Sequence, residues 1–497
     1  MQNKFRDGLW RSWKVFYRSV CTRVATPKFR VCVVGSGPAA MYSVECLLRF
    51  QATNAVVTNR LGIDVLERLP TPFGLLRYGV APDHPEVRNV EGKFQELLSH
   101  PQVRFFGNIE VGRDISVSEL RNLNSRRDYT VWCLFCKRFC CLNVVVIGQG
   151  NVALDVARII GKQAENLKKT DISSVALDCL ARSSVQNIYI VGRRGPVQAS
   201  WTAKELRECL YSVKGLQPCF EKEELVISDV DREELSSSRS TRRCFDLITK
   251  CFAEQSGSQE QQFARKLHLR FLWTPIAFQG YNDNTKVDNR HENRLCFTLF
   301  RRNRLTGSSG RQKPVLLEES AGNVYWNQSC ELAFRSIGYK GKPFELVPFD
   351  ERAGVVPNKC GRVLSRVEQT SEEEELFEKG LYVVGWLKRG PTGIVGSNKW
   401  DAEETVNVVA EDILSLAKTD THNFSVREDL QDVLRTRNIA FVNFEGWKRI
   451  DEEERRRGQR KGIEREKMLT WEELLDFGVV GSVYKSQGDE SELVTKK

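Results

Sequence analysis

Two glycine-rich loops, each between an apolar run and a helix-like run, constrain the fold of this chain more than any other feature. Gly35-Ser36-Gly37-Pro38-Ala39-Ala40 follows the apolar residues 29–34, and Gly148-Gln149-Gly150-Asn151-Val152-Ala153 follows the apolar residues 143–147. Glycine permits the tight turn and lets the backbone approach a pyrophosphate, while a small later residue allows close packing of helix on strand. The helix N-terminus then faces the anion. The sequence therefore predicts an α/β protein with two Rossmann-like dinucleotide-binding domains.

The residues that end the second strand of each unit distinguish the two dinucleotides. Glu67 follows an apolar run, at the position where a carboxylate binds a ribose hydroxyl. Its spacing from the first loop exceeds the usual distance because residues 51–60 form an inserted loop. After the second loop, the run 187–191 leads into Gly192-Arg193-Arg194-Gly195-Pro196 with no acid, and a guanidinium pair suits a 2′-phosphate. We therefore assign the first loop to FAD and the second to NADPH.

Composition narrows the class of protein. The chain has 41% hydrophobic and 28% charged residues, as in globular enzymes, and no run approaches the roughly 18 apolar residues of a transmembrane helix. The net charge of +10 favours an acidic partner and leaves peripheral contact with an anionic inner membrane open. No zinc finger, helix-turn-helix or RNP-type pattern occurs, so we expect no nucleic acid. The 15 cysteines are scattered, as in a reducing compartment.

Residues 1–28 differ from the rest of the chain. They are rich in Lys and Arg, and Asp7 is their single acid. Apolar residues recur there at roughly helical spacing, including Phe5, Leu9, Trp13 and Phe16. A basic, acid-poor, amphipathic segment is typical of a mitochondrial transit peptide, with a surface helix as the alternative. We therefore expect the protein in the mitochondrial matrix.

Three other segments have simpler patterns. Residues 216–265 are polar and predict helix with surface loops. Residues 381–384 predict a late strand that enters Gly385-Trp386. The charged segment from about residue 448 predicts a solvated helix.

Longer motifs around both loops make a family resemblance specific. Pro72-Phe73-Gly74-Leu75-Leu76-Arg77-Tyr78-Gly79-Val80-Ala81-Pro82-Asp83-His84-Pro85 follows the first loop, and Leu154-Asp155-Val156-Ala157-Arg158 extends the second. Ser336-Ile337-Gly338-Tyr339 and the run from Gly385-Trp386 to Arg389-Gly390-Pro391-Thr392-Gly393-Ile394 complete the set. Over residues 30–475 the chain resembles the mitochondrial NADPH:ferredoxin (adrenodoxin) reductase family.

The resemblance implies a domain layout and a set of contacts. The FAD-binding domain would be discontinuous, with parts at 29–131 and 336–475 around an NADP-binding domain at 143–335, a linker at 132–142 and a flexible tail at 476–497. Besides the loop glycines Gly35 and Gly37, FAD would contact Ala39, Glu67, Leu75, Val111, Trp386 and the backbone of Gly393, Ile394 and Val395. NADPH would contact Gln149, Gly150, Asn151, Val152, Arg193, Arg194, Glu205 and Gly393. Asp83 and His84 would lie near the flavin, tuning its polarity or forming a plain turn.

The resemblance also implies a reaction. Hydride passes from NADPH to FAD, and single electrons pass on to a [2Fe–2S] ferredoxin that serves P450s or iron–sulfur and haem biosynthesis. The cofactor supplies the chemistry, so we expect no catalytic side chain and no metal. Such ferredoxins are acidic, and Arg207, Arg239 and Arg243 match basic positions of the family's docking face. Arg239 and Arg243 share a face if their stretch is helical.

After Asp128-Tyr129-Thr130-Val131 the chain departs from the family pattern. The family's strand end near the flavin and its crossover to the NADPH domain are absent, and an apolar, Cys-rich stretch at 132–142 replaces them. Three interpretations remain: a splice or gene-model artefact, a genuine shortened isoform, or a metal site at Cys133, Cys136, Cys140 and Cys141. Adjacent cysteines on an apolar run give poor tetrahedral geometry. On the first two interpretations, the chain would bind FAD less tightly than the full-length family.

Other functions fit the sequence less well. The flavoprotein module of glutamate synthase and pyrimidine-degrading enzymes carries N-terminal cysteine clusters, but residues 1–28 contain only Cys21. Disulfide reductases need a redox cysteine pair after the first loop, where only Cys46 lies. A shortened isoform or paralogue with impaired FAD binding and no reductase activity is the remaining alternative.

Overall fold

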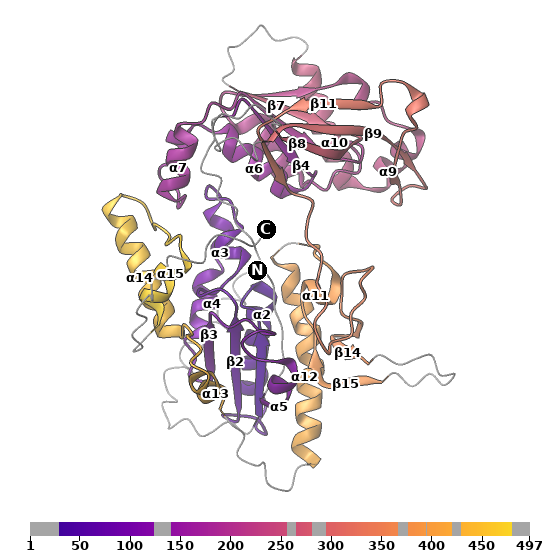
Figure 1. The fold of residues 1–497 in the computed structure, drawn as a ribbon. Coiled ribbons are helices and arrows are strands. Elements are labelled where there is room, and N and C mark those ends of the chain that lie inside the picture. Colours follow the sequence, from indigo (N-terminus) through magenta and orange to yellow (C-terminus); the bar gives the residue numbers. More distant parts are fainter. Residues whose placement is uncertain are drawn as a thin grey trace, which may run out of the picture.

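The computed structural model describes residues 29–123, 141–255, 265–280, 295–365, 376–393, 395–419 and 429–479. The expected transit segment 1–28, the linker residues 132–140 and Ile394 lie outside the described residues. The chain forms two lobes, one above the other in Figure 1, with the middle of the described chain in the upper lobe and its first and last described segments in the lower lobe. None of the described helices is long and apolar enough to cross a membrane.

A parallel sheet lies at the centre of the lower lobe. Its strands run in the order β1 (Phe29–Val34), β2 (Leu61–Glu67) and β3 (Val103–Gly107). Every residue of the central strand β2 is buried, as expected for a parallel strand covered on both faces. In the described part of the chain β1 pairs only with β2, so its other edge has no described partner strand.

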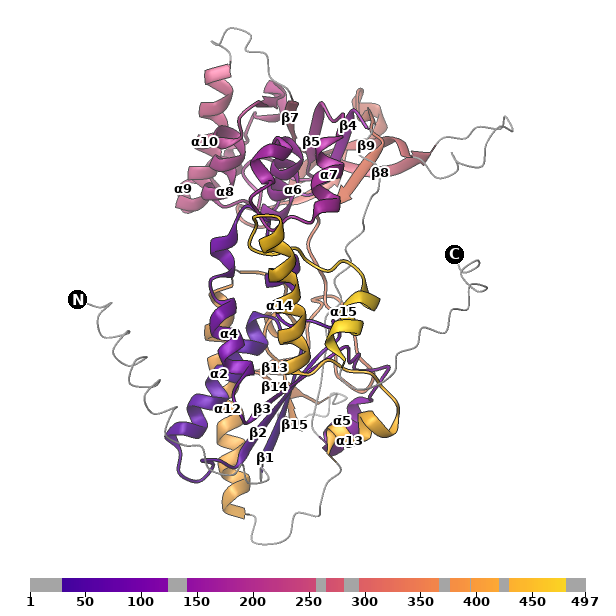
Figure 2. The same cartoon turned by 90° about the vertical axis from the view of Figure 1, so that its left-hand side faces the viewer.

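Helices from both ends of the sequence cover this sheet. The long helices α2 (Pro38–Thr53) and α12 (Ser397–Thr419) pack side by side (Figures 1 and 2). The main hydrophobic cluster of the lower lobe joins Leu47, Val65 and Phe94 to Ala402 and Trp447, so this core is built from distant segments of the chain. Its other elements are α3 (Leu75–Tyr78), η1 (Pro85–Arg88), α4 (Glu91–Leu98), α5 (Val117–Leu123), β13 (Asn358–Lys359), β14 (Arg362–Leu364), β15 (Phe377–Tyr382), α11 (Trp386–Arg389), α13 (Leu430–Thr436), α14 (Phe444–Arg460) and α15 (Trp471–Gly478).

The upper lobe contains a second parallel sheet. Its strands run in the order β12 (Leu332–Arg335), β4 (Asn143–Ile147), β5 (Asn187–Val191), β7 (Arg265–Arg270) and β6 (Leu216–Phe220). An antiparallel sheet joins β8 (Trp273–Gly280), β9 (Leu295–Thr306), β10 (Lys313–Leu316) and β11 (Tyr325–Ser329). The helical elements are α6 (Asn151–Gly161), η2 (Ala164–Leu167), α7 (Ser174–Ala181), α8 (Ala203–Arg207), the π-helical turn η3 (Glu208–Ser212), η4 (Lys222–Glu224), α9 (Asp229–Ser237), α10 (Arg239–Gln255) and η5 (Glu319–Ala321). Two parallel sheets with helices confirm the predicted α/β class.

Ionic contacts connect the two lobes. Asp83 of the lower lobe pairs with Arg158 and Lys162 of the upper lobe. Burial opposes ionisation of Asp83, but hydrogen bonds from these two cations outweigh it and lower the pKa of the carboxyl. Nearby, Lys467 Nζ lies 2.7 Å from Asp171 Oδ2. The lobes are therefore held together mainly by charged groups at this contact.

The structure changes three expectations about local structure. The stretch 216–265 contains the strand β6 at Leu216–Phe220, which its polar flanks concealed. The late strand β15 spans Phe377–Tyr382 instead of beginning at residue 381, because it pairs with β14 through Leu364 and Phe377. The charged segment from residue 448 is helical, but Glu454 is fully buried, so the expectation of a wholly solvated helix is wrong.

Candidate functional site

The first glycine loop has the geometry that a bound pyrophosphate requires. Gly35 adopts φ +85° and donates its N–H to Leu66 O at 2.7 Å, which turns the chain from β1 toward α2. Gly37 precedes the first turn of α2, and a Cβ added to it would meet no atom within 4 Å. The space in front of the helix N-terminus is therefore open, as an approaching phosphate needs. These residues fit the phosphates of a dinucleotide.

Glu67 lies directly behind this loop. Its Oε2 accepts hydrogen bonds from Ser36 N at 2.9 Å and from Ser36 Oγ at 2.6 Å, and its Oε1 accepts one from Leu69 N at 3.0 Å. Burial raises the pKa of Glu67, while the bonds from Ser36 oppose that shift. A carboxylate has about four acceptor positions. The carboxylate therefore holds the loop in place and keeps capacity to accept one ribose hydroxyl.

Other predicted flavin contacts gather around the first loop. Phe73 N donates to Ser36 Oγ at 3.0 Å, which places Leu75 at the start of α3 beside the loop. Gly385 packs closely against Ala39 of the first loop, since a Cβ added to Gly385 would lie 2.8 Å from Ala39 Cβ. Trp386, the first residue of α11, follows Gly385 and therefore also lies near the loop. The ring of Trp386 stacks on Tyr339 with centroids 5.5 Å apart.

Three further predicted contacts are placed less directly. Val111 is 2% exposed and packs with Leu66 and Phe106, so only its backbone could face a ligand. Gly393 has φ +87° and lies against Ser397, at the start of α12. Val395 packs on the core of the lower lobe, whereas Ile394 lies outside the described residues.

The second glycine loop repeats the arrangement in the upper lobe. Gly148 has φ +127°, and a Cβ there would lie 2.0 Å from Ser336 O, so this position requires glycine. Gly150 precedes α6 with open space in front of it, and Asn151 Oδ1 accepts a hydrogen bond from Thr202 N at 2.9 Å. Val152 is 54% exposed in the first turn of α6.

An unpartnered polar atom supports a ligand at this loop. Gln149 Nε2 is buried, yet it has no hydrogen-bond partner in the described part of the chain. A buried amide donor without a partner costs about 1–3 kcal/mol. A polar ligand group at the second loop would remove this cost, so the residues present fit a second dinucleotide.

Arg193 and Arg194 follow β5 at the edge of the same loop. Arg193 is exposed, and neither residue has an ion pair with a carboxylate in the residues the structure describes. Burial lowers the pKa of Arg194, and the neighbouring charge of Arg193 lowers it further. Two repelling guanidinium groups without an anion form a site that a phosphate would stabilise.

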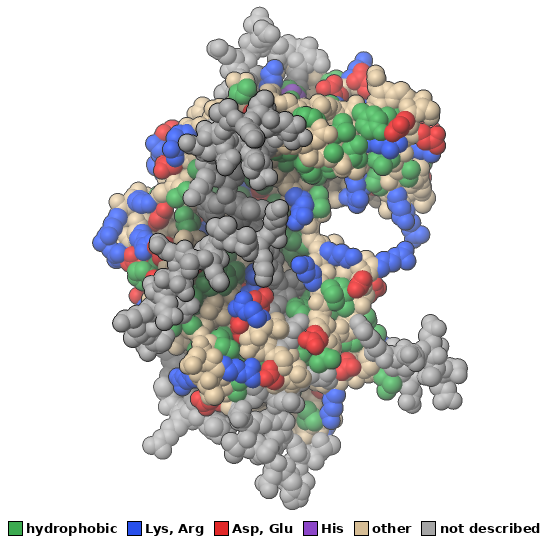
Figure 3. Space-filling model, in the orientation of Figure 1, with side chains coloured by type: hydrophobic (Ala, Val, Ile, Leu, Met, Phe, Trp, Pro, Cys, Tyr) green, Lys and Arg blue, Asp and Glu red, His purple; other side chains and the backbone are tan. Residues whose placement is uncertain are grey.

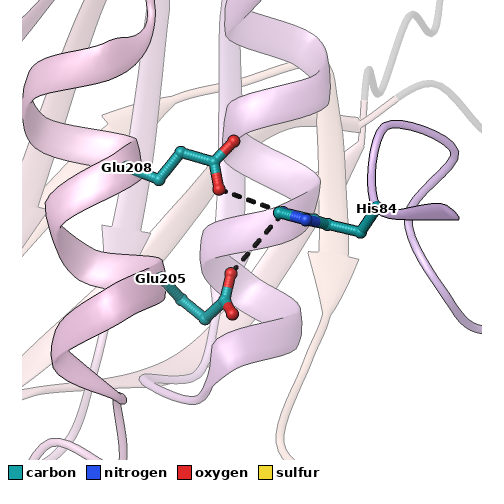
Figure 4. A group of neighbouring side chains, drawn as sticks. All are labelled: His84, Glu205 and Glu208. Carbon is teal, nitrogen blue, oxygen red and sulfur yellow. Dashed lines mark ion pairs between the residues drawn. The ribbon is translucent and has the colours of Figure 1, made fainter. Parts of the chain in front are cut away.

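Glu205 and the Asp83–His84 pair meet at the contact between the lobes. Glu205 Oε2 on α8 lies 3.6 Å from His84 Nε2, and Glu208 Oε2 lies 3.0 Å from the same nitrogen (Figure 4). The sequence motif had suggested a flavin-tuning role or a plain turn for Asp83 and His84. The structure shows that both residues also have ion-pair partners in the upper lobe. No local pattern could have shown this, because the contact depends on how the lobes dock.

The basic residues expected to face a partner lie on adjoining helices. Arg207 ends α8, and Arg239 and Arg243 lie in the first turns of α10, which packs against α8. The prediction that Arg239 and Arg243 lie on one helix is confirmed. All three are exposed and none has a carboxylate partner in the described part of the chain. Lys and Arg side chains also border the opening between the two lobes (Figure 3).

The chain contains two parallel sheets, and in each one a strand leads through a glycine-rich loop into a helix. This arrangement defines the class of two-dinucleotide flavoprotein oxidoreductases. The chain belongs to the NADPH:adrenodoxin oxidoreductase family. It is 36% identical to the mitochondrial NADPH:adrenodoxin oxidoreductase of Arabidopsis thaliana over 479 residues, covering 90% of this chain and 94% of that protein. It is 33% identical to the Bos taurus enzyme of the same name, covering 94% of each.

A solved structure agrees with this assignment. Mycobacterium tuberculosis FprA in complex with NADPH superposes with a TM-score of 0.77 at 30% identity, covering 91% of this chain and 99% of FprA. No protein-family model matches the chain. The relatives thus show the family, and the solved structure shows that the chain shares the fold of FprA.

Proposed function

We propose that this protein is a FAD-dependent NADPH:ferredoxin (adrenodoxin) reductase of the mitochondrial matrix. The observation that carries the proposal is the pairing of two open glycine loops, one backed by Glu67 and one flanked by Arg193 and Arg194. The curated relatives are named as mitochondrial enzymes of this activity. Bound FAD would accept a hydride from NADPH and release electrons singly, so no side chain needs to act as nucleophile or acid.

The residues of the chain bind and orient the two dinucleotides. In the lower lobe, the N–H groups around Gly37 would bind the FAD pyrophosphate, Glu67 would accept a ribose hydroxyl, and Leu75 and Trp386 would flank the flavin. In the upper lobe, the loop around Gly150 would bind the NADPH pyrophosphate and the two arginines its 2′-phosphate. This division supports a FAD-binding domain at 29–131 and 336–475 and an NADP-binding domain at 143–335.

The reaction can be tested directly. Purified protein with NADPH is expected to reduce cytochrome c only when a [2Fe–2S] ferredoxin is added, and its absorption spectrum should show bound flavin. Absence of reduction with ferredoxin present would count against the function. One tightly bound FAD per chain would in turn contradict the hypothesis that the shortened stretch at 132–142 weakens FAD binding.

We infer that the electron acceptor is an acidic [2Fe–2S] ferredoxin that docks on Arg207, Arg239 and Arg243. These exposed cations lie on two packed helices, and none of them has a carboxylate partner among the residues that the structure describes. Clustered charge of one sign accelerates docking of an opposite partner and makes it salt-sensitive. The net charge of +10 would also support peripheral contact with the anionic inner membrane.

Charge reversal tests this docking surface. R239E/R243E is expected to raise the KM for ferredoxin about tenfold or more at low salt, because each attractive contact becomes a repulsive one. The ratio of ferredoxin-dependent to ferricyanide-dependent turnover should fall accordingly, and the effect should shrink as salt is added. The control K168E/R182E makes the same change in charge at exposed positions elsewhere in the upper lobe. Equal losses in both variants would show a net-charge effect without a docking site.

A further inference from the structure

Two cysteines lie opposite each other at the end of the antiparallel sheet in the upper lobe. Strands β9 and β11 pair side by side (Figure 1), with Ser329 opposite Phe297 in the last pair of the ladder. Cys330 and Cys296 continue this register, because Cys330 N donates a hydrogen bond to Cys296 O at 3.0 Å. Directly opposed residues of an antiparallel pair present their side chains on the same face of the sheet. Cys296 and Cys330 are therefore cross-strand neighbours on one face.

A contact of the buried thiol shows which way it points. Cys330 has no exposed surface, and its Sγ lies 3.1 Å from Thr298 Oγ1 on β9. Thr298 is two positions from Cys296, so the side chains of these two residues lie on the same face. This is the inner face of the sheet, where Cys330 packs with Phe300 and with Val145 of β4. The Cys330 thiol thus leans onto β9 on the side that carries Cys296.

The spacing of the two backbones suits a disulfide. Hydrogen-bonded pairs of an antiparallel ladder have Cα atoms about 5.5 Å apart, and disulfides join residues whose Cα atoms are about 4.4–6.8 Å apart. The Cβ atoms of such pairs start about 5.5 Å apart and must approach to about 4 Å. Cys330 lies just beyond the end of β11, so only this end of the ladder has to shift.

The two thiols differ in their access to solvent. Cys296 is partly exposed, whereas Cys330 is fully buried. Burial raises the pKa of the Cys330 thiol, and the neighbouring Cys296 thiol adds to this rise. Since the thiolate is the nucleophile in disulfide exchange, Cys330 is poorly suited to react first with a dissolved oxidant. Cys296 is the thiol that such an oxidant can reach.

We propose that Cys296 and Cys330 form a reversible redox pair that glutathione disulfide oxidises to a cross-strand disulfide. The Cys296 thiolate attacks one sulfur of glutathione disulfide, and the glutathione thiolate that leaves takes up the proton that Cys296 lost. The Cys330 thiol then loses its proton and attacks the Cys296 sulfur of the mixed disulfide, which releases the second glutathione. The two protein thiols lose two electrons, and glutathione disulfide is reduced to two glutathione molecules.

The disulfide would fix the connection between the two sheets of the upper lobe. The chain leaves the antiparallel sheet at Ser329 and enters the parallel sheet at Leu332. The bond would also close the segment 296–330 into a loop, which restricts the unfolded chain and so stabilises the folded one. Because the Cβ atoms must be drawn together, the bond would be strained and therefore readily reduced. Its formation is thus expected to be reversible.

Peptide mass spectrometry of the oxidised protein tests the pair directly. The folded, flavin-loaded protein is reduced, freed of reductant, incubated with glutathione disulfide, alkylated and digested without further reduction. Wild type is expected to yield two peptides joined through Cys296 and Cys330, lighter by two hydrogen atoms than the separate peptides together. An excess of reduced glutathione should open the bond and make both thiols available to alkylation after unfolding.

Serine variants distinguish the roles of the two thiols. C330S should stop at the mixed disulfide, with one glutathione on Cys296, because the resolving thiol is absent. C296S should leave Cys330 almost unmodified, since that thiol is buried. C360S replaces an exposed cysteine of the lower lobe and should give the joined peptides as wild type does.

Thermal unfolding provides a second measurement. Glutathione disulfide should raise the unfolding midpoint of wild type and C360S by about 3 °C or more, but not that of C330S or C296S. Circular dichroism of the reduced proteins shows whether each variant is folded.

Two results would overturn the proposal. The first is the absence of the joined peptides from folded, oxidised wild type, whether Cys296 keeps a glutathione or remains a thiol. The second is their appearance only after the native circular dichroism is lost, which would show that the fold does not bring the two thiols together. Neither result bears on the reductase activity, because the oxidation is measured without NADPH or ferredoxin.

Discussion

Replacing Arg193 and Arg194 by alanine is expected to lower kcat/KM for NADPH by about 100-fold or more. A charge-assisted hydrogen bond contributes about 1.5–3 kcal/mol, so two guanidinium contacts to a phosphate contribute at least about 3 kcal/mol. Each 1.4 kcal/mol corresponds to a factor of ten. Removal of the two positive charges would leave a 2′-phosphate at the end of β5 without the partners that we propose for it.

The same variant should lose its preference for NADPH over NADH. NADH has no 2′-phosphate, so its kcat/KM should change by no more than about threefold. Ferricyanide serves as electron acceptor in this measurement, which removes any effect on ferredoxin docking. R182A, an exposed arginine on the same lobe, is the matched control and should behave as wild type. A parallel loss with both nucleotides would mean that these arginines support the fold and do not recognise the phosphate.

The parts of the site that the sequence predicted are those with local geometric requirements. Gly35 and Gly148 adopt positive φ, and Gly148 also has no room for a side chain, so the residue type reports the backbone conformation. Glu67 could be placed because it ends an apolar strand, and the structure brings it to the first loop as expected. The face shared by Arg239 and Arg243 followed from helical periodicity.

The parts that the sequence did not predict depend on contacts between distant segments. His84 and Glu208 meet only because the lobes dock through Asp83, Arg158 and Lys162. The strand β6 is short and lies between polar stretches, so its place in the sheet is decided by its pairing with β7. Periodicity reports which residues share a face, but it does not report which distant segment covers that face.

Glu454 gives the clearest case of such a contact. It lies in a run of charged residues that predicts a solvated helix, yet its side chain is fully buried. Arg77 Nη2 donates to both carboxylate oxygens, at 2.6 and 2.7 Å, across 377 positions of sequence. Arg465 Nη1 and Met468 N add hydrogen bonds at 3.0 Å each. This ion pair fastens α14 to α3, the helix that carries the predicted flavin contact Leu75.

Removing one member of this pair is therefore expected to destabilise the lower lobe strongly. E454A leaves the Arg77 guanidinium buried without its carboxylate and should lower the free energy of unfolding by about 3–5 kcal/mol. R77A leaves Glu454 paired with Arg465, so its loss should be smaller. The urea midpoint followed by circular dichroism measures this loss. The flavin should also dissociate more readily, because α3 loses its attachment to α14. E452Q, at an exposed position on the same helix, should change stability by no more than about 0.5 kcal/mol.

A double replacement distinguishes the attraction between the two charges from the cost of leaving one charge alone. Buried ion pairs can be exchanged for apolar side chains of similar volume with little loss, since desolvation offsets much of their attraction. R77M/E454L should therefore recover most of the stability that either single alanine variant loses. Losses that simply add in the double variant would show that each side chain acts through separate contacts, such as the stacking of Arg77 over the Trp447 ring at 4.9 Å. Recovery would instead show that the pair specifies how the two ends of the chain meet, and that its net contribution to stability is small.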